Sequence, residues 1–392
     1  MNKDVNMAHQ RRILFVFESL QQNGATKSLI ALLKCIKDDY DVSLFLFKRD
    51  VAAEAMLPDN IHILDEDDYY RALLCQMKPY VQEALRNRKW RLAWFRFRVF
   101  IERALGLPFR QWGKLKTIKG DWNFAIGYSD GFVAEVVANK VRCDKKLLWL
   151  HINPVLDPLP AKTLAAMQQV DGIVGVSKDC IANLERLLGK DKLPRRLVVH
   201  NIVDEKELRR LAASEQIVLP GEGFKILTVG RLTKEKGYDR IPAILKKLEK
   251  NGICVDWSII GAGLASVKGD VMASAQALGV DAHIHFLGAK DNPYPYFAAA
   301  DCYAQTSIAE GWCMTISEAL ALGKPVVVSD LPVFHEQVFE GENGYFAHDV
   351  DSFVEAISRV LTCGVKSSVH RQSPCALEQV AAEFYEAIKS VR

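Results

Sequence analysis

The chain has 392 residues, of which 49% are hydrophobic and 25% are charged, and its formal net charge at pH 7 is +3. This length exceeds what one hydrophobic core supports and fits two domains, and the small net charge excludes the basic surface of a general nucleic-acid-binding protein. The nine cysteines include no C-x-x-C pair, which favours free thiols in a reducing compartment over a disulfide framework or a zinc site. The apolar run at 13–17 is too short for a signal or membrane-spanning helix, so we expect a cytoplasmic protein.

The first half of the chain is typical of parallel strands that alternate with helices. Apolar runs expected of buried strands lie at 13–17, 42–47, 61–64, 124–128, 147–150, 172–177 and 197–201. After the first run, Gly24 permits a tight turn and Thr26 can cap the next helix. A turn of this kind points backbone N–H groups towards a ligand. We therefore treat Gly24 as a candidate binding residue, with an ordinary strand-to-helix turn as the alternative.

A histidine directly follows the run at 147–150. Residues just past the carboxyl end of a parallel strand lie where doubly wound sheets bind ligands. His151 is therefore a candidate active-site residue. The alternative is a hydrogen-bonded histidine that serves the structure alone.

The segment 86–119 differs in composition from the rest of the chain. It contains eleven Lys or Arg residues and one acid, Glu102, with large apolar side chains at helical spacings of three and four. Basic residues beside Trp and Phe on an amphipathic helix favour adsorption to an anionic membrane surface. Packing against the protein's own domain and RNA stacking are the alternatives. The candidate membrane-contact residues are Arg88, Trp90, Arg91, Trp94 and Arg98.

The second half begins after a polar segment, 205–223, that contains P-G-E-G and is interpreted as a linker region. Its expected strands lie at 225–229, 255–261, 283–287 and 325–329, with a further short strand at the start of the stretch 301–330, to which 298–303 leads. The G-A-G at 261–263 lacks the third glycine and the acid of a dinucleotide fingerprint. Hydride transfer is therefore disfavoured.

Two cations follow the strand at 225–229. Arg231 and Lys236 are five residues apart and leave the strand end together. Two cations at such a place can neutralise a diphosphate as it departs, which stabilises a transition state without a metal ion. Solvated surface charges are the alternative.

The stretch 301–330 reads as a short strand, a loop, a helix and a buried strand. Glu310 and Glu318 are eight positions apart. With a helix from Gly311 onwards, a rise of 1.5 Å per residue places the carboxylates roughly 12 Å apart, which is too far for an acid–base pair. The N–H groups of Gly311, Trp312, Cys313 and Met314 at the start of this helix suit a diphosphate. The alternative is an amphipathic helix with two solvated glutamates.

These motifs resemble those of the family 4 glycosyltransferases. G-R-x-x-x-x-K-G at 230–237 and E-x7-E at 310–318, followed by A-L-A-x-G-x-P-V-V, stand in the family's order and spacing. Trp312 and Cys313 stand where the family usually has Phe-Gly, and Ile202 stands where it has glycine in an N-G-V-D turn. The resemblance is dense in the second half of the chain and thin in the first.

The resemblance implies the GT-B fold, in which two Rossmann-like α/β domains face a central cleft. It implies an acceptor-binding domain at 1–204, a linker region at 205–223, a donor-binding domain at 224–375 and a helix at 376–392 that returns to the first domain. Its implied reaction is retaining and metal-independent, and it moves a sugar from a nucleotide-diphosphate sugar, UDP-linked being the first expectation.

The resemblance also implies roles for single residues. Arg231 and Lys236 would bind the donor diphosphate, Glu310 the sugar, Glu318 the ribose, and the backbone near Lys290 the base, while His151 would reach the reaction centre. With the basic segment, this implies a glycan or lipid-linked acceptor in cell-surface polysaccharide or lipopolysaccharide assembly, no nucleic-acid partner, and a location on the inner face of the plasma membrane. A sugar-nucleotide epimerase and a catalytically silent membrane-associated subunit are the alternative functions.

Overall fold

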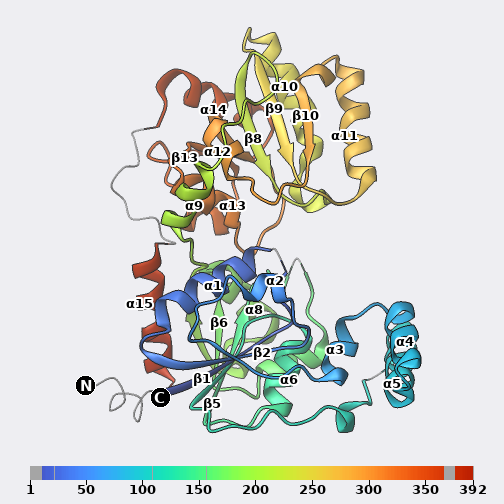
Figure 1. The fold of residues 1–392 in the computed structure, drawn as a ribbon. Helices are drawn as coiled ribbons and strands as arrows, with labels where there is room; N and C mark the ends of the chain where they lie inside the picture. The colour runs from blue at the N-terminus through green and yellow to red at the C-terminus, as the bar shows by residue number, and fades with distance from the viewer. Residues whose placement is uncertain (1–10, 22, 108, 156, 366–375, 392) are drawn as a thin grey trace. The chain divides into compact units, whose positions relative to one another are not determined.

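The computed structural model describes residues 11–21, 23–107, 109–155, 157–365 and 376–391. Within them, the chain divides into two compact units (Figure 1). The first comprises Met1–Val176, Ile181–Val199 and Ala381–Arg392, and the second comprises Ser177–Cys180 and His200–Val380. The expected fold class, two Rossmann-like α/β domains, is confirmed.

The first unit is built on a parallel sheet with strand order β3-β2-β1-β4-β5-β6-β7. The strands are β1 (Arg11–Phe17), β2 (Tyr40–Leu46), β3 (His62–Ile63), β4 (Phe124–Gly127), β5 (Lys145–Leu150), β6 (Gly172–Gly175) and β7 (Arg195–Val198). Central β1 pairs with β2 and with β4, and its residues from Ile13 to Phe17 are buried, as a strand covered on both faces requires. Only two residues of the run at 61–64 are strand, since β3 lies at the edge of the sheet.

Helices cover both faces of this sheet. The helices of this unit are α1 (Gly24–Ile36), α2 (Val51–Glu54), α3 (Asp68–Leu74), α4 (Met77–Arg86), α5 (Trp90–Ala104), α6 (Phe132–Lys140), α7 (Ala161–Met167), α8 (Lys178–Leu188) and α15 (Leu377–Ser390), of which α4 and α5 lie to the side of the sheet. Phe384 of α15 stacks on Phe15 and Trp149 of the sheet. Helix α6 packs on the other face, because a methyl group on Gly127 would meet Val133 and Val137.

The second unit has a parallel sheet with strand order β10-β9-β8-β11-β12-β13. The strands are β8 (Phe224–Val229), β9 (Val255–Ile260), β10 (Ile284–Gly288), β11 (Cys302–Gln305), β12 (Val326–Ser329) and β13 (Gly344–Ala347). The helices are α9 (Glu205–Ala212), α10 (Ile241–Lys250), α11 (Ala265–Leu278), α12 (Tyr294–Ala299), α13 (Met314–Ala321) and α14 (Val350–Cys363). The main core lies between the sheet and α10, α11 and α14, while α9 packs against α12 and α13.

Two local features differ from expectation. The segment expected as a linker, 205–223, begins with helix α9, because the Asp204 side chain caps it and Leu208 is buried beneath it. Helix α1 is capped by Asn23, whose side chain accepts a hydrogen bond from the Thr26 N–H, so Thr26 is not the cap. In both places a polar side chain just before the helix satisfies its first N–H groups.

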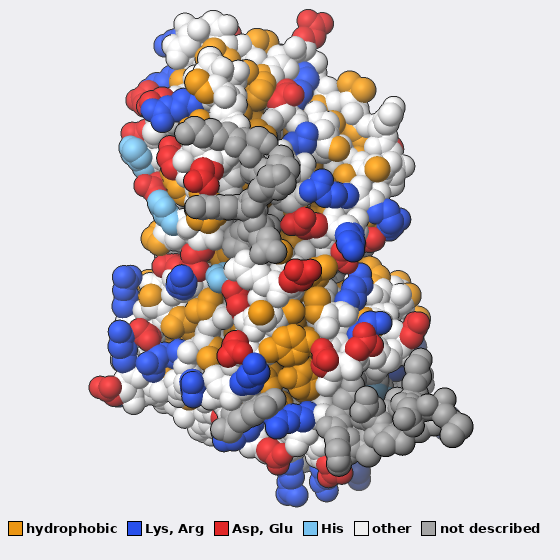
Figure 2. Space-filling view, turned by 90° about the vertical axis from the view of Figure 1, so that its left-hand side faces the viewer, with side chains coloured by type: hydrophobic (Ala, Val, Ile, Leu, Met, Phe, Trp, Pro, Cys, Tyr) orange, Lys and Arg blue, Asp and Glu red, His pale blue; other side chains and the backbone are white. Residues whose placement is uncertain are grey.

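The eight cysteines within the described ranges are free thiols. Cys375 lies outside those ranges. The face seen in Figure 2 carries basic and acidic side chains side by side, in keeping with a formal net charge of +3.

Candidate functional site

The strand order of the second sheet reverses between β8 and β11. At such a switch point the crossovers leave in opposite directions, and a crevice opens beyond the carboxyl ends of the two strands. Lys236 lies in the short 3₁₀ turn η4 (Lys234–Lys236) after β8, and Glu310 lies in the loop after β11. The topology therefore brings these two residues, 74 positions apart, to one place.

Lys236 and Glu310 form an ion pair. The Lys236 Nζ donates to Glu310 Oε1 over 2.6 Å, and the two side chains are only 16% and 10% exposed. Burial disfavours the ammonium form, but the adjacent Cys313 and Glu310 outweigh it, and the pKa of Lys236 is raised. The lysine is therefore a fixed positive charge with few water contacts, which strengthens its field on a bound anion.

A row of hydroxyl and amide groups supports the Glu310 carboxylate. Ser307 Oγ donates to Glu310 Oε1 over 2.7 Å, and Gln305 Nε2 donates to Ser307 Oγ over 2.7 Å. The Tyr303 hydroxyl contacts Gln305 and donates to Thr315 Oγ1 over 2.7 Å. Sequence reasoning missed this row, although the alternation of Tyr303, Gln305 and Ser307 along one strand face is a visible signal.

Arg231 lies five residues before Lys236 and is solvent-exposed. Its loop is held by backbone contacts, since the Leu232 N–H donates to Ala262 O and the Leu264 N–H donates to Leu232 O, each over 2.9 Å. The glycines at 261 and 263 make this approach possible, because a methyl group on Gly261 would lie 1.9 Å from Gly230 O. The G-A-G motif therefore holds the loop that carries Arg231.

Glu318 lies on α13, one helical turn or more beyond the other residues. Its side chain is buried, and the Tyr294 hydroxyl of α12 donates to its Oε1 over 2.9 Å. Burial raises the pKa of Tyr294, so the phenol keeps its proton as a donor. Glu318 is therefore a carboxylate held in place from α12, and Tyr294 is a positioning residue that the sequence reasoning did not include.

The helix after Glu310 begins later than expected. It starts at Met314, with Cys313 at its N-cap, because Gly311 and Trp312 remain in the loop. Trp312 is buried against the His200 ring at 5.0 Å, so its side chain packs inside the unit. Cys313 is buried too, and burial raises its pKa to about 11. Of the four residues expected to offer helical N–H groups, the first two lie in the loop, Cys313 is the N-cap and only Met314 is helical.

Lys290 lies past β10, where its ammonium stands 5.4 Å from the Tyr296 ring centroid. Tyr296 belongs to α12, the helix that also supplies Tyr294. One helix therefore contacts both Lys290 and Glu318.

The two candidate residues of the first unit lie past β1 and β5. Gly24 is the first residue of α1 and has no positive φ, so the turn does not depend on a left-handed glycine there. The backbone N–H of His151 donates to the Asp130 carboxylate over 3.1 Å. The buried Nε2 of His151 has no hydrogen-bond partner among the described residues. Burial lowers the pKa of His151 to about 4 and raises that of Asp130 to about 7.

Helix α5 carries four of the five expected membrane-contact residues, Arg88 lies just before it, and the helix has two different faces. Leu92, Phe95 and Val99 are buried against its own unit, while Trp90 and Trp94 are 66% and 62% exposed. Helices α4 and α5 pack together beside α3 (Figure 1). The aromatic face is thus distinct from the face that packs. In the part of the chain that the structure describes, no helix combines the length and apolarity needed to cross a membrane.

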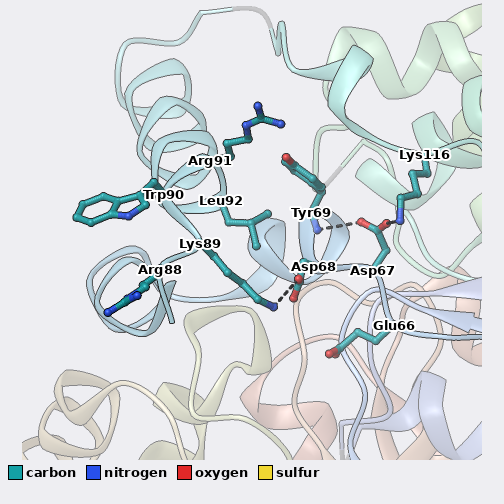
Figure 3. Close-up of a pocket in the computed structure, with 10 residues that line it drawn as sticks. All are labelled: Glu66, Asp67, Asp68, Tyr69, Arg88, Lys89, Trp90, Arg91, Leu92 and Lys116. Atoms are coloured by element: carbon teal, nitrogen blue, oxygen red, sulfur yellow. Dashed lines mark hydrogen bonds and ion pairs between the residues drawn. The ribbon is translucent and has the colours of Figure 1, made fainter. Parts of the chain in front are cut away.

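A hollow of about 650 Å³ lies at the start of α5 (Figure 3). On its inner side Lys89 pairs with Asp68 over 2.7 Å, and Lys116 pairs with Asp67 over 3.2 Å. Arg88 and Trp90 point away from these acids (Figure 3). Arg88 and Arg91 form no ion pair with any described residue. The start of α5 therefore presents unpaired cations next to exposed aromatic rings.

Comparison with known proteins matches part of the second unit to a described family. Residues 210–374 match the family described as glycosyl transferases group 1. A D-inositol 3-phosphate glycosyltransferase of Mycobacterium leprae is 32% identical over 171 residues, which are 42% of this chain and 40% of that protein. The O-antigen biosynthesis glycosyltransferase WclY of Escherichia coli is 24% identical over 142 residues, 36% of this chain and 38% of that protein. This chain thus matches about two fifths of the length of these curated relatives.

Solved structures match over almost the whole chain and share its fold. The Anabaena protein Alr3699/HepE, in complex with UDP and glucose, superimposes with a TM-score of 0.66 at 17% identity and covers 97% of this chain and 100% of that one. The lipopolysaccharide outer core galactosyltransferase WaaB gives a TM-score of 0.63 at 17% identity over 97% of this chain and 99% of that one. The second unit therefore matches the group 1 glycosyltransferase family over residues 210–374, and the solved structures show the GT-B fold over almost the whole chain.

Proposed function

We propose that this protein is a retaining, metal-independent glycosyltransferase that uses a nucleotide-diphosphate sugar, with UDP as the first nucleotide to test. The observation that carries the proposal is the largely buried Lys236–Glu310 ion pair at the switch point of the second sheet. The UDP bound to the Anabaena structure and the UDP-2-fluoro glucose bound to a trehalose-6-phosphate synthase of the same fold support the choice of nucleotide.

The reaction follows from the charges on the two strand ends. Lys236 and the exposed Arg231 attract the donor diphosphate and stabilise the charge that grows on it as the sugar–phosphate bond breaks. Glu310 accepts from sugar hydroxyls, and Glu318, fixed by Tyr294, accepts from the ribose. Glu310 is a poor nucleophile because Lys236 and Ser307 both donate to its Oε1. This favours attack by the acceptor on the face that the diphosphate leaves.

Alanine substitutions at the cations test this assignment. We expect Lys236→Ala and Arg231→Ala each to lower turnover by about 100-fold, because a contact made in the transition state is lost. Lys234→Ala is the matched control, since Lys234 is exposed and lies in the same 3₁₀ turn. Near-normal turnover of both test variants would remove them from the site. Thermal unfolding of each variant separates a damaged fold from a damaged site.

A thermal-shift screen against nucleotide sugars identifies the donor. Stabilisation by one base and sugar, together with transfer to an acceptor, is the expected result. Turnover of the donor without any acceptor would favour an epimerase instead. Donor binding without transfer would favour a catalytically silent subunit.

We further propose that the acceptor is a glycan or lipid-linked sugar in cell-surface polysaccharide or lipopolysaccharide assembly, reached from an anionic membrane surface. The names of WclY and WaaB support this class of acceptor. The exposed Trp90 and Trp94 beside the unpaired Arg88 and Arg91 support membrane contact, because aromatic rings settle at the interface and the cations attract anionic lipid.

Vesicle sedimentation tests the membrane part by itself. We expect binding to vesicles that contain phosphatidylglycerol, little binding to pure phosphatidylcholine, and loss of binding in Arg88→Glu/Arg91→Glu and in Trp90→Ser/Trp94→Ser. Lys192→Glu/Lys250→Glu is the control, because it reverses two exposed charges elsewhere. Binding that survives in both test variants would place any membrane contact outside α5. Binding to RNA with the same variant pattern would favour the nucleic-acid alternative.

A further inference from the structure

Four metal-ligating side chains lie on one face of two neighbouring strands of the second unit. Cys254 and Asp256 lie at the start of β9, and His283 and His285 lie at the start of β10. The strands pair in parallel with Ile284 opposite Trp257 and His285 opposite Ser258. Because side chains alternate along a strand, C-x-D and H-x-H each place two ligands on the same side, and the register brings the pairs together.

Three of the four side chains are close enough together to bind one metal ion. One ligand atom each from Cys254, Asp256 and His283 lie within 4.8 Å of one another. His283 Nδ1 lies 3.1 Å and His285 Nε2 lies 3.3 Å from the same oxygen, Asp256 Oδ1. Tetrahedral zinc with bonds of about 2.0 to 2.3 Å separates its ligand atoms by about 3.3 to 3.8 Å, so small side-chain movements close the site.

The surrounding chain already fixes the central carboxylate. The other oxygen, Asp256 Oδ2, accepts from the Gly223 N–H over 2.7 Å and from Lys225 Nζ over 3.2 Å. Asp256 is buried, with 3% of its surface exposed. Oriented ligands of this kind are the outer contacts that metal sites use. Lys225 occupies Oδ2 only, so its charge leaves Oδ1 available to an ion.

The P-G-E-G segment lies directly over this cluster. A methyl group on Gly221 would lie 2.0 Å from the Asp256 carboxylate, and one on Gly223 would lie 2.8 Å from Cys254 Sγ. Gly221 has a φ of +85°, a conformation that glycine adopts without strain. The two glycines therefore let the loop close on the ligand atoms, which no account of the transfer reaction requires.

From this geometry we propose that the second unit binds one divalent transition-metal ion, with Zn²⁺ as the best match, through Cys254, Asp256 and His283, with His285 next to the same carboxylate. Sulfur, imidazole and carboxylate are the ligands zinc prefers, and a thiolate with a carboxylate neutralises its two positive charges. The C-x-x-C criterion overlooks this site because its ligands come from two strands.

The ion has a structural role. The site lies at the amino ends of β9 and β10, whereas Lys236 and Glu310 follow the carboxyl ends of β8 and β11. Binding joins the two strand ends beneath the 220–223 loop, so it stabilises the folded unit by mass action and supplies nothing to sugar transfer. The proposal stands apart from the proposed glycosyltransferase function.

Metal titration of the full-length protein, stripped with a chelator, tests the proposal. We expect binding of one Zn²⁺ per chain by calorimetry, and a rise in the unfolding temperature of roughly 5 °C or more at zinc concentrations a hundredfold above Kd. With Co²⁺ we expect a thiolate-to-cobalt charge-transfer band. Absence of both the zinc shift and the band in the wild-type protein would overturn the proposal.

Variants assign the ligands. Cys254→Ser should abolish the charge-transfer band, and His283→Gln should weaken Zn²⁺ binding by about 100-fold, while both keep the metal-free unfolding temperature. Cys363→Ser is the matched control, since Cys363 is the other exposed cysteine of the described part of this unit. Equal binding in Cys254→Ser and wild type would show an adventitious ion only. Lys236→Ala should lose transfer yet bind Zn²⁺ normally, which separates this proposal from the catalytic one.

Discussion

At the scale of single residues, the site of the second unit depends on a few buried polar contacts. Lys236 holds Glu310, and Tyr294 holds Glu318, so each carboxylate has a partner from a different element. In low dielectric such contacts fix geometry, and the loss of one partner leaves a buried charge with too few donors. The carboxylates are therefore sensitive to residues that would not themselves touch a donor.

Tyr294→Phe tests this dependence. Removing the hydroxyl takes a donor from the buried Glu318 carboxylate, and we expect donor affinity to fall by about tenfold with little change in turnover of bound donor. Isothermal titration with the nucleoside diphosphate measures it. Tyr296→Phe is the control on the same helix. If donor affinity in Tyr294→Phe equals that of wild type, Tyr294 does not position Glu318 for binding.

His151 and Asp130 give opposing pH dependences of stability. The pKa of His151 falls to about 4 on folding, so between about pH 4 and 6.5 the unfolded chain binds a proton that the folded one does not, and stability is lost as pH falls. The pKa of Asp130 rises to about 7, so over about pH 4 to 7 stability is lost as pH rises.

In the wild-type protein these two effects nearly cancel. We therefore expect the unfolding free energy of His151→Gln to be about 2 kcal/mol higher at pH 5 than at pH 7, because only the Asp130 dependence remains. The unfolding free energy of the wild-type protein should differ much less between the two pH values. Urea unfolding of both proteins at the two pH values measures the difference. Parallel pH dependences would show that His151 is not held neutral by burial.

At the scale of elements, glycine contacts decide where the cation-bearing loop lies. Gly261 and Gly263 accept the backbone of 230–232 at distances that exclude a side chain, and this places Arg231 beyond the strand end. Helix α5 is a second example, because one of its faces packs on the unit and the other carries exposed aromatic rings. Helical periodicity predicts that such a helix has an apolar face, while contacts decide which face is covered.

Gly261→Ala tests the loop. The added methyl group would lie 1.9 Å from Gly230 O, so the loop must move, and we expect stability to fall by about 1 to 3 kcal/mol together with weaker donor binding. Denaturant unfolding and donor titration measure the two effects. Gly269→Ala is the control, because Gly269 lies inside α11 and a methyl group there would have no other atom within 4 Å. This variant should raise the unfolding free energy by up to about 1 kcal/mol. Wild-type behaviour of Gly261→Ala would refute the close approach.

At the scale of the whole molecule, the last helix links the ends of the chain. Helix α15 begins in residues that group with the second unit, and from Ala381 onwards its residues group with the first unit. Phe384 is fully buried against Phe15, Tyr40 and Trp149, so the C-terminal residues complete a core whose strands lie at the N-terminus.

Phe384→Ala should lower the unfolding free energy of the first unit by about 3 to 5 kcal/mol, since it leaves a cavity among aromatic side chains. Denaturant unfolding followed by tryptophan fluorescence measures the loss. Lys389→Ala, on the exposed side of the same helix, should change stability by less than about 0.5 kcal/mol. A small effect of Phe384→Ala would mean that the first unit folds without α15.

Local patterns in the sequence determined the elements of this protein. Buried parallel strands are continuous apolar runs, and these predicted ten of the described strands to within two residues, while β7 was displaced, β11 was located only approximately and β13 was not predicted. The spacing of these motifs, together with the family resemblance, placed Arg231, Lys236 and Glu310 after strand ends and Glu318 on the following helix before any contact was known. Both kinds of signal lie within short windows of sequence, which is why they can be read without the fold.

Only the tertiary structure decided which of these residues meet. The Lys236–Glu310 pair, the Tyr294 contact with Glu318 and the Cys254–Asp256–His283 cluster join residues from different crossovers. The structure likewise showed that α13 starts at Met314 and that Trp312, just before it, is buried against His200. Strand order and register set these contacts. Neither can be predicted from a single segment, because each depends on how several strands pair.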